Sequence, residues 1–145
     1  EKMAQIPGAE SWGIDFGDAT YFKGRVAELR GDFDTAIAEY HKTLDWDAIA
    51  SVAKMGLARC YRKQGKYDRA RDALADLIRT RPYATIYRME MARLEQESGN
   101  VEAAIKQVQV ALRVWENADP DFVPAQEARA LLGELHTKRA AEAGA

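Results

Sequence analysis

Apolar residues recur at helical spacing on both sides of three glycines that lie 34 residues apart along the chain. These are Gly31, Gly65 and Gly99, in the stretches LRGDFDTAIAEY (29–40), KQGKYDRARDAL (63–74) and ESGNVEAAIKQV (97–108). Glycine adopts the left-handed backbone that often ends a helix without the steric cost of a Cβ atom. Each stretch therefore predicts two helices joined by a sharp turn at the glycine.

Small residues recur at two fixed distances from each glycine. Seven residues before it stand Gly24, Ala58 and Ala92, and five residues after it stand Ala36, Ala70 and Ala104. Small side chains let two helix backbones approach closely, whereas larger ones would push them apart. Because helix pairs of this length bury their faces by stacking on neighbouring pairs, we predict an array of stacked pairs.

This pattern resembles the tetratricopeptide repeat, whose small first-helix residue, turn glycine and second-helix alanine match the three sets above. The aromatic residue after the turn is present as Phe33 and Tyr67 but is Val101 in the third unit. The resemblance covers about residues 17–116 and implies an all-α fold, a right-handed superhelical α-solenoid. The predicted organisation is a non-repeat segment, three repeats, and a linker with a capping helix, at residues 1–16, 17–50, 51–84, 85–118 and 119–145.

The junctions between repeats differ in sequence. The proline that usually closes a repeat is present only as Pro82, and we expect the junctions at Ala48 and Glu116 to be looser or longer. After the third repeat, Pro120 and Pro124 predict a linker and then a final helix over about residues 124–141, which would cap the last repeat.

The run W-x-x-A-D-P-D at Trp115–Asp121 is similar to the end of repeat arrays in bacterial multi-domain proteins, notably the C-terminal regions of some serine/threonine kinases. No kinase motif is present in the chain itself. Residues 1–16 do not fit the repeat. Their apolar residues favour a cap packed on the first helix, and the alternative is a pseudo-ligand lying in a groove of this chain or of a neighbour.

Length and charge narrow the function classes. A chain of 145 residues holds one domain with a sizeable core, and its formal net charge of −2 argues against a nucleic-acid partner. We expect no membrane span, because no run of eighteen apolar residues exists. The chain begins at Glu1, so we expect either a processed protein or a fragment of a longer one. The sequence does not indicate a compartment.

Candidate catalytic chemistry is sparse. His41 and His136 fall on different predicted helices, and Cys60 occupies a register that Val26 and Leu94 share, which predicts a buried position. No metal-ligand spacing, phosphate loop or nucleophile motif is present. We therefore predict no enzyme activity, no cofactor and no metal.

Binding is better supported, because the first helices of stacked pairs line a concave surface. The family's groove positions, carried over by the resemblance, form three rows on one helix face. They are Tyr21, Met55 and Met89; Arg25, Arg59 and Arg93; and Glu28, Arg62 and Gln96. Arginine binds carboxylates through two parallel hydrogen bonds, and methionine adapts to varied apolar contacts. The rows predict a protein or peptide ligand, extended or a short helix, with acidic and apolar residues.

Arg59 is the strongest single candidate within these rows, because it lacks an acidic residue at helical spacing, whereas Arg25 has Glu28 and Arg93 has Glu90 and Glu97. An alternative is that the arginines only form local ion pairs. The second functional hypothesis is a structural or homo-oligomerising part of a larger bacterial signalling or enzyme chain, associating through a repeat end or the N-terminal segment.

Two related classes do not fit. Repeat domains that clamp a chaperone's C-terminal carboxylate place lysine and asparagine where this chain has Tyr21 and Arg25. The expected asparagine of the second repeat is Gly56, and the expected basic residue of the third is Glu90. RNA-reading helical repeats need a variable polar code that is missing here.

Overall fold

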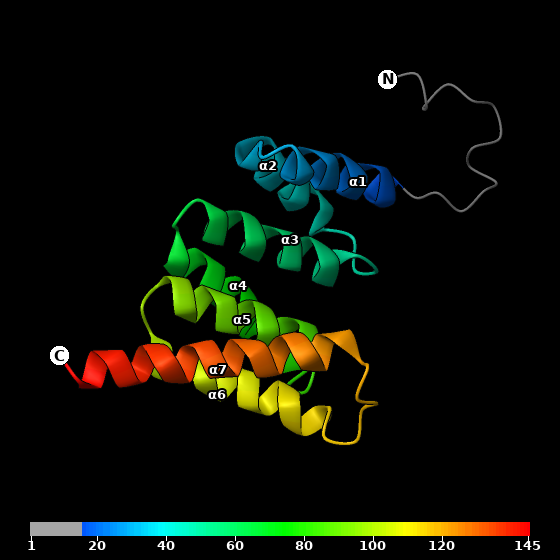
Figure 1. Ribbon diagram of the computed structural model, residues 1–145. Helices are drawn as coiled ribbons and strands as arrows, with labels where there is room; N and C mark the ends of the chain where they lie inside the picture. The colour runs from blue at the N-terminus through cyan, green and yellow to red at the C-terminus, as the bar shows by residue number, and fades with distance from the viewer. Residues whose placement is uncertain (1–15) are drawn as a thin grey trace. The chain divides into compact units, whose positions relative to one another are not determined.

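The computed structural model describes residues 16–145, and this part of the chain forms seven α-helices and no strand (Figure 1). The predicted cap or pseudo-ligand role of residues 1–16 thus falls outside the described residues, apart from the first residue of α1. The chain divides into two compact units, residues 1–64 and 65–145, and the boundary falls in the turn between the two helices of the second predicted repeat.

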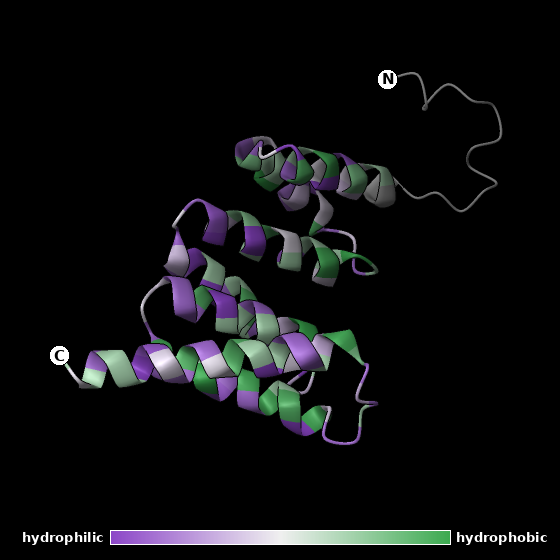
Figure 2. Cartoon of the chain, viewed as in Figure 1, coloured by the Kyte–Doolittle hydropathy of each residue, from purple (hydrophilic) through white to green (hydrophobic). Residues whose placement is uncertain are grey.

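The first unit contains α1 (Phe16–Leu29), α2 (Phe33–Thr43) and α3 (Ala50–Lys63), and each of these helices packs on the other two. The second contains α4 (Tyr67–Thr80), α5 (Thr85–Glu97), α6 (Val101–Val114) and α7 (Val123–Ala143), with successive helices packed on one another. Each helix carries both hydrophobic and hydrophilic residues (Figure 2), as expected for helices with one face in a core.

The three turn glycines confirm the prediction made from their spacing. Gly31, Gly65 and Gly99 have φ values of 77°, 71° and 86°, in the left-handed region that favours glycine. After the first of these turns, the Asp32 side chain accepts a hydrogen bond from the Thr35 backbone N–H at 3.2 Å and caps α2. The glycine and the cap together fix where one helix ends and the next begins.

Small residues on the first helices make room for the second helices. In unit 1 the ring of Tyr40 on α2 is fully buried between Gly24 on α1 and Gly56 on α3. A Cβ atom at either glycine would overlap this ring, so the tyrosine fits only because both positions lack a side chain. In unit 2 the corresponding residues of α5 and α6 are Ala92 and Val108, both fully buried.

The junctions follow the proline pattern. The connection that contains Pro82 covers only residues 81–84, whereas those at Ala48 and Glu116 cover 44–49 and 115–122. The final helix extends the predicted range by one residue at its start and two at its end, and Pro124 lies in its first turn, where the missing N–H costs nothing. Ala125, Ala128 and Leu135 on α7 are buried, and α7 packs on α6.

Candidate functional site

Residues from the second and third rows of predicted binding residues meet on α1 and α3 of unit 1, which are neighbouring helices. Arg25 and Glu28 project from α1 one turn apart, and their side chains form an ion pair at 2.9 Å. Arg59 reaches the same carboxylate from α3, with its Nε 2.5 Å from Glu28 Oε1 and its Nη2 2.9 Å from Oε2. The Tyr40 hydroxyl donates a further hydrogen bond to Glu28 Oε2 at 2.5 Å.

Glu28 is therefore the centre of a charged cluster, which we call the Glu28 cluster: Arg25, Glu28, Tyr40 and Arg59. Its carboxylate side chain is only 9% exposed, and the side chains of Arg25 and Arg59 are 38% and 24% exposed. Two cations share one anion, so the cluster has a net positive charge with both guanidinium groups open in part to solvent. This arrangement can accept a second carboxylate without burying an unpaired charge.

Electrostatics within the Glu28 cluster fix its protonation. Burial by itself would raise the pKa of Glu28, but hydrogen bonds from Arg59 and Tyr40 and the charge of Arg59 outweigh it and lower the pKa to about 2. Burial, together with the bond to this carboxylate, raises the pKa of Tyr40 far above its usual range. At neutral pH the carboxyl group is thus ionised and the phenol remains a donor.

The prediction that Arg59 lacks an alternative partner is wrong. Its partner Glu28 lies 31 residues earlier in the chain, so no search at helical spacing on α3 finds it. The repeat register held the signal. Glu28 lies one turn beyond Arg25 on α1, and Arg59 is the equivalent of Arg25 on α3, so the stacking of the two helices places Glu28 beside Arg59. The predicted local pairs of Arg25 with Glu28 and of Arg93 with Glu90, at 2.9 and 3.7 Å, are present.

The remaining predicted residues of unit 1 are less open than an exposed groove requires. Tyr21 is half-buried, and its ring packs against the ring of Tyr40 with centroids 5.8 Å apart. Met55 and Arg62 on α3 are buried. A binding role for these three residues stays a prediction.

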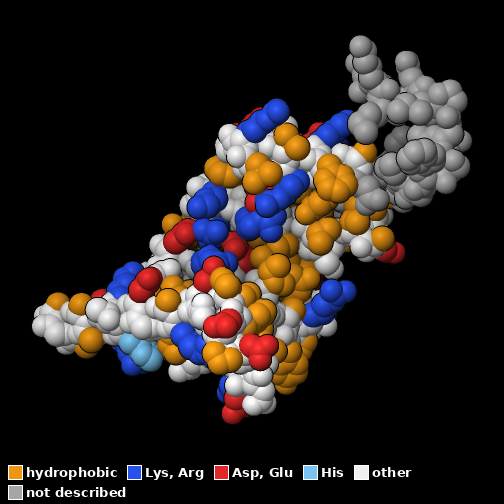
Figure 3. Space-filling model, turned by 45° about the vertical axis from the view of Figure 1, so that its right-hand side comes forward, with side chains coloured by type: hydrophobic (Ala, Val, Ile, Leu, Met, Phe, Trp, Pro, Cys, Tyr) orange, Lys and Arg blue, Asp and Glu red, His pale blue; other side chains and the backbone are white. Residues whose placement is uncertain are grey.

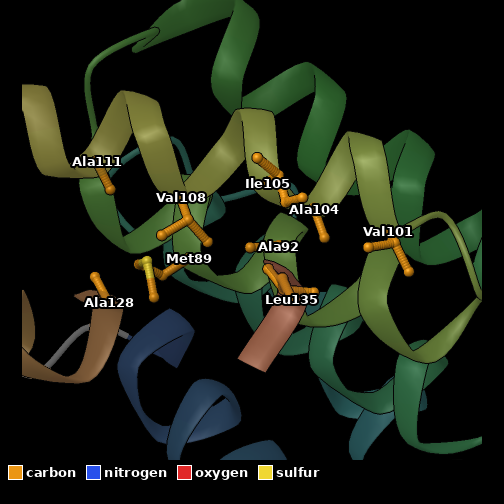
Figure 4. Packing of buried hydrophobic residues seen from close by; sticks show 9 residues of the cluster. All are labelled: Met89, Ala92, Val101, Ala104, Ile105, Val108, Ala111, Ala128 and Leu135. Atoms are coloured by element: carbon orange, nitrogen blue, oxygen red, sulfur yellow. The ribbon is translucent and has the colours of Figure 1, made fainter. Parts of the chain in front are cut away.

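In unit 2 the predicted row on α5 divides into core and surface residues. Met89 is buried in an apolar cluster with residues of α6 and α7, including Val108 and Ala128 (Figure 4). Met89 is thus as buried as Met55, because α7 supplies neighbours that the repeat comparison did not place, and a binding role for it also stays a prediction. Arg93 is exposed and Gln96 is half-buried, so these two residues remain candidates for contact with a ligand.

A second buried carboxylate, Glu95, was missed by the sequence analysis. Arg71 on α4 donates to it from Nε at 2.8 Å, and the side-chain amide of Asn100 donates at 2.7 Å. The hydrogen bond from Arg71 lowers the pKa of Glu95 against the opposing effect of burial. Glu95 shares its repeat register with Ala27 and Tyr61, and a carboxylate at a position that is otherwise uncharged was the available signal.

Cys60 and His41, two of the residues considered for catalysis, have contacts typical of structural residues. Cys60 is buried as predicted, and burial raises the pKa of its thiol to about 12, so it stays protonated at neutral pH. His41 is exposed, with its Nε2 3.0 Å from the Tyr61 hydroxyl. Within residues 16–145 no three His, Cys, Asp or Glu side chains are placed to hold a metal ion, and no helix there has the length and apolar character to cross a membrane.

Comparison with known proteins agrees with the repeat pattern. Residues 29–87 match the family model of the tetratricopeptide repeat. No curated protein matches the chain in sequence.

Solved structures with a similar fold include type III secretion chaperones. SycD from Yersinia enterocolitica, a translocator chaperone in an alternative dimer, has a TM-score of 0.75 and 17% identity, covering 85% of this chain and 93% of SycD. PcrH from Pseudomonas aeruginosa has a TM-score of 0.75 and 17% identity, covering 86% of this chain and 94% of PcrH. SycD in complex with a peptide of the translocator YopD has a TM-score of 0.73 and 17% identity, covering 84% of this chain and 93% of that SycD chain. The chain thus has an all-α fold of the solenoid class, and its residues 29–87 match the tetratricopeptide repeat.

Proposed function

We propose that this chain is a protein-interaction module whose repeats, at residues 17–50, 51–84 and 85–118, bind an extended or short helical peptide with acidic and apolar residues. The observation that carries this proposal is the Glu28 cluster, in which two partly exposed arginines contact the same carboxylate. The fold likeness to SycD, which has been solved with a translocator peptide, supports peptide binding as the class of function.

The charge balance of the Glu28 cluster favours an acidic ligand residue. Arg25 is the more exposed of the two arginines and contacts Glu28 through Nη1, whereas Arg59 makes two hydrogen bonds to it. We infer that the Arg25 side chain turns toward a ligand carboxylate, while Arg59 holds the Glu28 carboxylate in place. A guanidinium group with free N–H donors suits this role because it can serve two carboxylates at once.

The test is binding of the whole chain to a diverse peptide array at low and moderate salt. We expect hits rich in acidic and apolar residues that weaken as salt screens the charged contacts. Arg25→Gln should weaken such a hit by about fivefold, equivalent to roughly 1 kcal/mol for a partly exposed ion pair. Lys42→Gln on α2 is the matched control, since it removes one exposed positive charge from the same unit and should leave affinity unchanged.

Arg59→Glu is a poor test, because it would place a second carboxylate beside Glu28 and lower stability as well as binding. Equal affinity of the wild type and Arg25→Gln for every hit would contradict the proposed role of the Glu28 cluster. Absence of any hit, combined with self-association in sedimentation, would favour the alternative of an oligomerising part of a larger chain.

A further inference from the structure

An apolar stripe runs along the exposed side of α1. Phe22, Val26 and Leu29 are 63%, 44% and 71% exposed. Their spacing of four and three residues places them on one helix face, one turn after another. We call these three residues the α1 stripe. Figure 3 shows hydrophobic side chains, with Lys and Arg side chains among them, at the surface over the N-terminal helices.

The repeat register indicates what normally covers such a face. Thirty-four residues after Phe22 and Val26 stand Gly56 and Cys60 on α3, and both are buried. Gly56 faces the ring of Tyr40 on α2, the second helix of the preceding repeat, and Cys60 lies one turn further along the same face. Phe22 and Val26 of the α1 stripe are therefore on the face that a preceding second helix would cover, whereas Leu29 corresponds to the exposed Lys63. No described element of unit 1 covers the three residues.

We propose that residues 1–15 of the same chain cover the α1 stripe, in the place of a preceding second helix. The segment joins α1 directly at Phe16. Fifteen extended residues span up to about 50 Å, more than twice the roughly 21 Å length of a 14-residue helix, so the segment can fold back along all of α1. This inference does not depend on the proposed peptide ligand.

The sequence of the segment suits this place. Although residues 1–16 do not fit the repeat as a whole, the segment carries the apolar residues Ile6, Trp12 and Ile14, which can cover an apolar face. Its acidic residues also complement the cations beside the stripe. The segment holds Glu1, Glu10 and Asp15 against a single Lys2, whereas Lys23 on α1 and Arg30 just after it are exposed.

A second copy of the chain fits the α1 stripe less well. A stable dimer buries about 800 Å² on each partner. Even an aromatic side chain buries only about 150–250 Å², so one phenylalanine, one valine and one leucine fall short of that area. A tethered segment needs much less contact, because its effective concentration at the stripe is on the order of millimolar.

The fluorescence of Trp12 tests this proposal in the full chain. In a parent carrying Trp46→Phe and Trp115→Phe, Trp12 is the remaining tryptophan, and acrylamide quenching reports its exposure. We expect Trp12 to be shielded equally at all protein concentrations. Phe22→Ser combined with Leu29→Ser should raise quenching severalfold, with unchanged far-UV circular dichroism. Tyr83→Ser combined with Ile86→Ser, at comparably exposed apolar positions in unit 2, is the matched control and should leave quenching unchanged.

Three results would overturn the proposal. If acrylamide quenches Trp12 equally in the parent and in a free peptide of residues 1–15, the segment covers nothing. Shielding that is lost on dilution would assign the α1 stripe to a second copy. Shielding that survives the stripe substitutions would place the segment on another surface.

Discussion

The two units fill the same repeat positions in different ways. In unit 1 a buried tyrosine, Tyr40, lies between two glycines and donates to Glu28. In unit 2 the equivalent second-helix residue is Val108, which packs with Ala92 and with Leu135 of α7 in an aliphatic cluster. The space between the first and second helices therefore holds a similar total side-chain volume in both units. A large residue against glycines fills it in unit 1, and a medium-sized residue against alanine fills it in unit 2.

The difference has an electrostatic consequence. The large residue chosen in unit 1 has a hydroxyl group, and it brings a carboxylate and two arginines into contact with the core. The α6–α7 core of unit 2 consists of apolar side chains. Stability of unit 1 should therefore depend on pH through Glu28, whereas the packing of α7 should not depend on it.

The largest expected effect is in the aliphatic core. Leu135→Ala removes a fully buried side chain of α7 and should lower the free energy of unfolding by roughly 2–5 kcal/mol, because the neighbours fill the cavity only in part. Urea unfolding followed by circular dichroism measures this loss. His136→Ala, at the next and exposed position, should have almost no effect, and equal losses for both variants would contradict the role given to α7.

Removal of the carboxylate in unit 1 comes next. The folded pKa of Glu28 is about 2 against an ordinary 4.5, so the ionised group stabilises the fold above about pH 4.5, and this contribution is lost as pH falls toward 2. Glu28→Gln should thus cost about 2–3 kcal/mol at pH 7, and the difference from the wild type should narrow below about pH 4.5. Urea unfolding across this pH range measures it, with the exposed Glu102→Gln as control.

The same substitution should have opposite signs in the two units. Gly56→Ala puts a methyl group against the Tyr40 ring, and this overlap should lower the free energy of unfolding by about 1–3 kcal/mol. The higher helix propensity of alanine should offset roughly 1 kcal/mol of that loss. Gly133→Ala on α7 meets no atom within 4 Å and should stabilise by about 0.5–1 kcal/mol. Thermal unfolding of the two variants decides the point, and stabilisation by Gly56→Ala would refute the tight fit around Tyr40.

The smallest effect is expected at an exposed ion pair. Arg79 on α4 contacts Asp76 at 2.7 Å, but its side chain is mostly in solvent. Arg79→Ala should change the free energy of unfolding by less than about 0.5 kcal/mol. A loss as large as that of Glu28→Gln would mean that exposed and buried pairs do not differ in the way described here.

Much of the scaffold could be predicted from sequence, because the information is local. The left-handed turns at Gly31, Gly65 and Gly99, the buried Cys60 and the final helix follow from residue type and spacing alone. The contacts of the candidate site could not be predicted in the same way. The partner of Arg59 lies on another helix, and Met89 is buried by a helix outside the repeats. These outcomes depend on tertiary contacts that helical spacing does not encode.

The most direct test of the Glu28 cluster is a titration of the Glu28 carboxyl group by carbon-13 NMR in the whole chain. A carboxylate held by Arg59 and Tyr40 should titrate with a pKa of about 2, well below the ordinary 4.5. A pKa at the ordinary value would mean that α1 and α3 are not joined through this carboxylate. Arg59 would then be as available to a ligand as Arg25, and the different roles given to the two arginines would be wrong.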